Sequence, residues 1–171
     1  LARPTAAEPD IQALRGQKVM LESGAEELQA YLSREGLTAQ DYQLIAHRTS
    51  LPDLINGQVA AISAYSSNEP LILQQAGVAF YQFTPRSAGI DFYGDNLFAS
   101  NKLWQKKPEV VEKFRAASLR GWSYAMQHPA EVIEYMQQRY PTDTSRAMLL
   151  AEAAAMQSLV TLINAGALIQ A

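Results

Sequence analysis

Two short polar clusters hold the side chains that are best placed to do chemistry. The first, residues 65–70, reads Tyr-Ser-Ser-Asn-Glu-Pro and follows an apolar, strand-like run. The second, residues 89–100, sets Asp91 and Tyr93 between two glycines, and Asp95 follows directly. Carboxylates accept hydrogen bonds from amino and ring N–H groups, and a tyrosine ring can stack on a heterocycle. These residue types therefore suit contact with a small nitrogenous molecule.

The first cluster offers Tyr65 and Glu69, which are four residues apart where the strand-like run passes into a helix. In open α/β sheets ligands bind outside the carboxyl ends of the strands, so both side chains can face one cleft. The alternative is that Glu69 only satisfies the backbone amides of the first helical turn. The residue pattern alone leaves both roles open, and a ligand contact of Tyr65 and Glu69 is the prediction that a resemblance to a ligand-binding family would favour.

The second cluster has a comparable alternative. Aspartates beside glycines often cap backbone amides in a turn, so this segment could be an ordinary hinge. Three polar side chains within five residues are nevertheless dense for a turn of that kind. We expect Asp91, Tyr93 or Asp95 to contact a ligand, with Asp91 as the leading candidate.

Two further strand ends supply candidate rim residues. Ser23 and Gly24 stand at the start of a predicted helix, where Ser23 and Glu26 have the spacing of a capping box. Free amides there could bind an anion, but neighbouring acids oppose this, so we expect contact with a neutral or cationic ligand. Arg48 and Thr49 lie in a polar stretch at the end of another predicted strand.

Composition and motifs exclude several classes of function. The 171 residues contain no cysteine and only two histidines, which lack metal-ligand spacing. We therefore expect no metal, no cofactor and no catalytic residue. The net charge of −3 gives no reason to expect a nucleic-acid partner. No apolar run approaches the ~18 residues of a membrane span.

The order of predicted elements indicates an α/β fold followed by helices. Strands and helices alternate over the first half of the chain, which favours a mostly parallel, doubly wound sheet. The predicted strands are residues 18–21, 42–46, 59–64 and 78–83, and the predicted helices between them are residues 23–35, 52–57 and 69–75. Residues 108–126, 130–140 and 144–165 have helical patterns of apolar residues.

Four motifs resemble the thiamine-pyrimidine-precursor branch of periplasmic substrate-binding proteins. They are Asn68-Glu69-Pro70, the segment from Gly89 to Ser100, the segment from Ser118 to Ala125, and His128-Pro129. The resemblance covers nearly the whole chain and implies a periplasmic-binding-protein-like (type II) fold. Residues 1–86 would form the second α/β lobe, and Leu1 to Pro4 the end of the strand that enters it. Residues 87–171 would form a crossing strand and C-terminal helices that return to the first lobe.

The resemblance also implies a function. Proteins of this branch bind small solutes for ABC importers, and similar domains are the extracytoplasmic sensors of signalling proteins. It implies a periplasmic or extracytoplasmic location, a pyrimidine-like thiamine precursor or similar nitrogenous solute, and either an ABC permease or an attached signalling module as partner. Relatives of this branch bind nitrate, sulfonate and taurine, but the acidic candidate residues disfavour anions.

Two other functions stay open. Eukaryotic relatives of this fold make the thiamine pyrimidine itself with iron and an active-site histidine, near a cysteine-rich motif that this cysteine-free chain lacks. A structural or interaction module is the other alternative. Because binding proteins of this type have two lobes, we expect the chain to be part of a longer protein and to bind ligand weakly alone. Uncovered apolar helix faces would then favour a homodimer.

Overall fold

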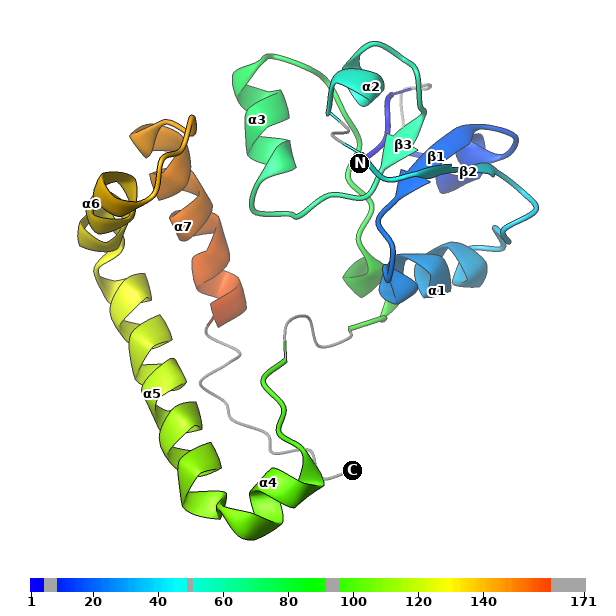
Figure 1. Cartoon of the computed structure of the whole chain (residues 1–171). Coiled ribbons are helices and arrows are strands. Elements are labelled where there is room, and N and C mark those ends of the chain that lie inside the picture. Colours follow the sequence, from blue (N-terminus) through cyan, green and yellow to red (C-terminus); the bar gives the residue numbers. More distant parts are fainter. Residues whose placement is uncertain (5–8, 49–50, 92–95, 161–171) are drawn as a thin grey trace. The chain divides into compact units, whose positions relative to one another are not determined.

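The computed structural model describes residues 1–4, 9–48, 51–91 and 96–160. The chain divides into two units, Leu1–Tyr93 and Gly94–Ala171. The first unit contains a sheet with helices around it, and the second contains helices (Figure 1). Each unit is described by itself.

The first unit is built around three parallel strands. β1 (Lys18–Leu21) lies in the middle, with β2 (Gln43–Ala46) on one side and β3 (Ala61–Ile62) on the other. β1 reads Lys-Val-Met-Leu, and its last three residues are buried, as expected for a strand covered on both faces. Ala2 forms antiparallel bridges with β3 and with Tyr81, so the N-terminal residues extend the sheet.

Among the described residues of the first unit, three α-helices and two short 3-10 helices accompany the sheet. The α-helices are α1 (Glu26–Arg34), α2 (Leu51–Ile55) and α3 (Glu69–Gln75), and the 3-10 helices are η1 (Ile11–Leu14) and η2 (Pro85–Ala88). Gly77 follows α3 with a φ of +67°. A residue without a side chain takes this left-handed conformation without strain, which explains why the helix ends at the predicted place.

The core has two parts, one for each face of the sheet. Alternate strand residues point to opposite faces, so Val19 packs with Leu32 of α1 in one cluster. Met20 packs with Leu54 of α2 and Leu73 of α3 in the other. This division confirms the expected α/β unit with a covered parallel sheet.

Two of the predicted strands are shorter in the structure. The strand predicted at 59–64 is regular only over Ala61–Ile62. The strand predicted at 78–83 is reduced to the single bridge between Tyr81 and Ala2. A strand requires several consecutive pairings, and in the described part of the chain residues 78–83 pair with the N-terminal segment only at Ala2 and Tyr81. The prediction of a full strand at 78–83 is therefore wrong.

The capping box predicted at the start of α1 is also wrong. The helix begins at Glu26, and its N-cap is Ala25, which makes no side-chain cap hydrogen bond. The amide of Ala25 donates to the carbonyl of Glu22 at 3.3 Å. A capping box would need Ser23 as the N-cap, but here residues 22–25 form a turn. Ser23 therefore lies in the connection between β1 and α1.

The second unit contains four helices among its described residues: α4 (Asn101–Lys106), α5 (Pro108–Gln127), α6 (Pro129–Arg139) and α7 (Arg146–Val160). Proline opens both α5 and α6, where its missing N–H group costs no helical hydrogen bond. α4 was not predicted; the Ser100 hydroxyl caps it by accepting from the Leu103 amide at 3.2 Å. In the described part of the chain, no helix is long and apolar enough to cross a membrane.

The segment expected to form the crossing strand has no regular secondary structure over residues 96–100. Residues 92–95 lie outside the described part. A strand needs a hydrogen-bonded neighbour, and none of the described strands pairs with residues 96–100. The role of this segment as a link between two lobes stays a prediction.

Candidate ligand-binding site

The loops that leave the three strands meet at one edge of the sheet. Because the strands are parallel, their carboxyl ends point the same way. We call the connections that follow them, residues 22–25, 47–48 and 63–69, the carboxyl edge. Ser23, Gly24, Arg48, Tyr65 and Glu69 all lie at this edge, and their contact with a ligand stays a prediction.

Hydrogen bonds join the loop after β1 to the loop after β3. The Glu22 amide donates to Ser63 Oγ at 2.9 Å, and the Ser63 amide donates to the Met20 carbonyl at 2.8 Å. The Tyr65 hydroxyl lies 3.4 Å from Glu22 Oε2, a long hydrogen bond. Glu22 therefore belongs with the candidate site residues, although the sequence indicated it only as a neighbouring acid. Its place directly after the central strand was the available signal.

Glu69 accepts a hydrogen bond from a backbone amide, which is the kind of structural role given above as the alternative to a ligand contact. Its Oε2 accepts from the Tyr65 amide at 2.8 Å, so the carboxylate braces the loop that precedes α3. A carboxylate has two oxygens and about four acceptor positions. Glu69 can therefore brace this loop and still accept a hydrogen bond from a ligand.

Arg48 is paired within its own segment. Its Nε donates to Asp53 Oδ2 at 2.7 Å, and this hydrogen bond raises the pKa of the guanidinium above its ordinary value. Asp53 therefore compensates the positive charge of Arg48 at the carboxyl edge. Thr49, the other candidate from this stretch, lies outside the described residues.

Gly24 gives the loop after β1 its shape. Its φ is +84°, a left-handed conformation that favours glycine. Ser23 beside it is exposed, so this loop presents a hydroxyl and backbone groups to solvent next to Glu22. This arrangement suits a rim contact.

Asp91 lies in the segment after η2. It forms an ion pair with Arg86, whose Nη2 is 3.0 Å from Asp91 Oδ1, and both side chains are exposed. Exposed ion pairs are weak, about 0–1 kcal/mol, so this pair does not commit Asp91 to a structural role. Tyr93 and Asp95 lie outside the described residues.

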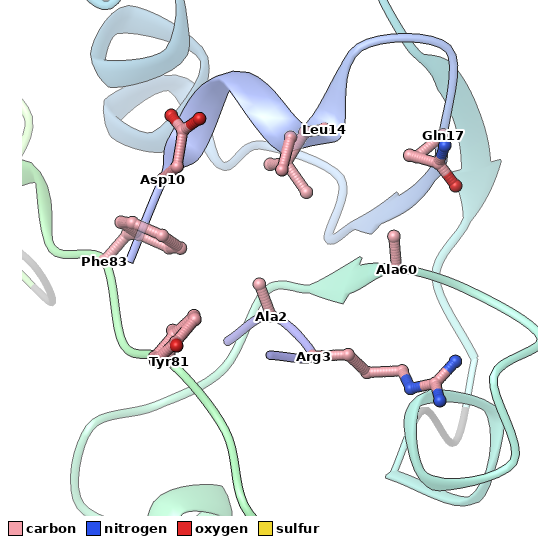
Figure 2. A pocket seen from close by; sticks show the side chains of 9 residues that line it. Ala2, Arg3, Asp10, Leu14, Gln17, Ala60, Tyr81 and Phe83 are labelled. Atoms are coloured by element: carbon pink, nitrogen blue, oxygen red, sulfur yellow. The ribbon is translucent and has the colours of Figure 1, made fainter. Parts of the chain in front are cut away.

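A cavity lies elsewhere in the first unit. Figure 2 shows a hollow of about 260 Å³ between the N-terminal segment, η1 and the segment around Tyr81. Its lining includes Gln17, before β1, and Ala60, before β3, so it lies toward the amino ends of these strands. Asp10 on its rim already accepts from the Gln12 amide at 2.8 Å. We do not assign a ligand to this hollow.

The two histidines lie in different units. His47 follows β2, and His128 stands between α5 and α6, where its ring centroid is 4.4 Å from that of Tyr124. Among the described residues, no group of three or more His, Cys, Asp or Glu side chains could hold a metal ion.

Comparison with known families identifies the relatives of this chain. Residues 6–132 match the family described as NMT1/THI5 like. The chain belongs to the NMT1/THI5-like family. The matched region contains the whole carboxyl edge.

A solved structure shows the same fold. It is described as the periplasmic sulfonate-binding protein SsuA of a sulfonate ABC transporter from Methylobacillus flagellatus KT. The two chains are 20% identical with a TM-score of 0.58, over 86% of this chain and 46% of the other. The NMT1/THI5-like chain thus has a periplasmic-binding-protein-like fold and spans less than half the length of this relative. No curated protein sequence matches it.

Proposed function

We propose that this protein binds a small solute without catalysing a reaction, and that the solute contacts the carboxyl edge of the sheet. The observation that supports this proposal is the set of contacts there: Glu22, Ser63, Tyr65 and Glu69 come together from two neighbouring loops. Ligands of open α/β sheets bind at this edge. The binding-protein fold gives the same expectation.

We propose a nitrogenous solute with N–H donors, such as the aminopyrimidine precursor of thiamine. Two carboxylates at the edge, Glu22 and Glu69, can accept hydrogen bonds from amino groups, and the exposed ring of Tyr65 can stack on a heterocycle. A sulfonate would place a negative charge beside these acids, and the nearby Arg48 is already paired with Asp53. Like charges at a binding site cost affinity, which favours the aminopyrimidine.

The biological setting follows as part of the proposal. The protein would act outside the cytoplasm, either delivering the solute to an ABC permease or serving as the sensor of an attached signalling module. Ser23, Gly24 and Asp91 are proposed as further ligand contacts, together with Arg48, Thr49, Tyr93 and Asp95. The enzyme alternative is disfavoured because the chain lacks cysteine and its two histidines stand in different units.

Titration with two ligands tests the proposal. We expect the aminopyrimidine to shift amide resonances of the isotope-labelled protein, whereas taurine leaves them unchanged at the same concentration. Nuclear magnetic resonance detects weak binding as well as tight binding. Shifts with taurine alone would support a sulfonate binder instead, and shifts with neither ligand would contradict this ligand class.

We also propose that the apolar surface of the helical unit is covered by another protein surface. Phe98, Phe114 and Trp122 have exposed fractions of 90%, 59% and 44%, and apolar side chains that gather into one exposed patch tend to be buried against another protein surface. A second copy of the chain is the proposed cover. Sedimentation should then show dimers as the protein concentration rises, and a monomer at all concentrations would contradict this proposal.

A further inference from the structure

We propose that Ser63 is a positioning residue for the ligand site. Its hydroxyl replaces a backbone carbonyl at the end of the β1–β3 ladder, and this replacement sets the spacing between Glu22 and the loop that carries Tyr65 and Glu69. The inference rests on the proposed solute-binding role of that edge. It adds a residue that the sequence did not indicate.

The hydrogen bonds of the ladder show the replacement. In a parallel pair, evenly spaced backbone bonds alternate between the two strands. The Ala60 amide donates to the Lys18 carbonyl, and the Ser63 amide donates to the Met20 carbonyl, both at 2.8 Å. In a continued ladder, the Glu22 amide would next donate to a backbone carbonyl of the β3 chain. It donates instead to Ser63 Oγ at 2.9 Å.

The burial of Ser63 explains why the replacement is stable. Ser63 is 7% exposed, so its hydroxyl lies in the interior of the first unit. A buried hydroxyl requires a partner, and the Glu22 amide supplies one. The chain after Ser63 can then leave the sheet, and the Glu22 amide, the first after β1, still has a hydrogen-bond acceptor.

Tyr65 connects the two carboxylates of the edge. Its hydroxyl reaches Glu22 Oε2, and its amide donates to Glu69 Oε2. The Glu22 amide donates to the hydroxyl of Ser63. Ser63 is two residues before Tyr65 in the chain, so this hydrogen bond ties the Glu22 backbone to the loop that carries Tyr65. The distance between the two acceptors offered to a ligand therefore depends on the hydroxyl of Ser63.

Two substitutions separate the hydroxyl from the rest of the side chain. Ser63→Ala removes the acceptor, and Ser63→Thr keeps it. With Ser63→Ala we expect roughly tenfold faster hydrogen exchange of the Glu22 amide and shifted ring resonances of Tyr65, since the lost bond is of ordinary strength. Affinity for the aminopyrimidine should fall by roughly tenfold. Ser63→Thr should restore all three values.

Thr38→Val provides a matched control. The Thr38 hydroxyl donates to Asp41 Oδ2 at 2.7 Å, in the turn that leads into β2, so this variant loses one hydroxyl contact away from the carboxyl edge. It should leave the Glu22 amide and the affinity unchanged. Circular dichroism shows whether each variant is folded.

The outcomes distinguish this inference from the proposed function. If the parent binds the aminopyrimidine and folded Ser63→Ala binds equally well, Ser63 has no positioning role. If the parent binds no aminopyrimidine, the ligand assignment fails, and the Glu22 exchange and the Tyr65 resonances decide the role of Ser63. Unchanged exchange and resonances in folded Ser63→Ala would overturn the inference in either case.

Discussion

Replacing Leu73 with alanine is expected to destabilise the α/β unit by about 2–5 kcal/mol, because the change removes a fully buried side chain and leaves a cavity. Leu73 is 0% exposed and packs from α3 against Met20 and Leu54. Native domains are stable by only about 5–15 kcal/mol, so the variant should lose a large part of the free energy of unfolding. Chemical denaturation followed by circular dichroism measures this change.

Ile72→Ala is the control for the same helix. Ile72 precedes Leu73 in α3 but is 36% exposed, so its truncation should cost about 1 kcal/mol or less. Equal losses for the two variants would mean that α3 does not bury the face described above. The placement of Glu69 at the start of α3 would then be wrong as well.

Replacing Glu69 with glutamine is expected to weaken aminopyrimidine binding by roughly ten- to a hundredfold. A hydrogen bond to a charged group contributes about 1.5–3 kcal/mol, and tenfold in affinity corresponds to about 1.4 kcal/mol. Glutamine keeps an oxygen that can accept from the Tyr65 amide, so the loop should keep its shape. Calorimetric titration of both proteins measures the difference.

Glu109→Gln is the matched control for this loss of charge. Glu109 lies in the first turn of α5, in the other unit, as Glu69 lies in the first turn of α3. The control removes the same charge from a comparable helical position, so its affinity should equal that of the parent. If Glu69→Gln also binds like the parent, the carboxylate only braces its loop.

The parts of the fold that were predicted correctly have strong local signals. β1 is a short apolar run bounded by turn residues, and the structure gives it the predicted bounds. α3 also has its predicted bounds, Glu69–Gln75, because Pro70 favours a helix start and Gly77 ends it. Composition and local pattern were sufficient for these elements.

The features that were missed depend on tertiary context. The Glu22–Ser63 contact joins residues 41 positions apart, and only the strand order brings them together. The strand predicted at 78–83 has a strand-like sequence, but its length depends on the neighbour available for pairing. Ser23 and Glu26 have the spacing of a capping box, but the turn closed by Ala25 and Glu22 prevents it. Local patterns do not contain this information.

The central claim is that a nitrogenous solute binds at the carboxyl edge, and the amide resonances of the labelled protein test it most directly. With saturating aminopyrimidine, we expect the largest shifts at residues 22–24 and 63–69, and small shifts at Arg3, Gln17 and Tyr81 around the hollow of Figure 2. The reverse pattern, with shifts confined to the hollow, would place the ligand at the amino ends of the strands and would contradict the site proposed above.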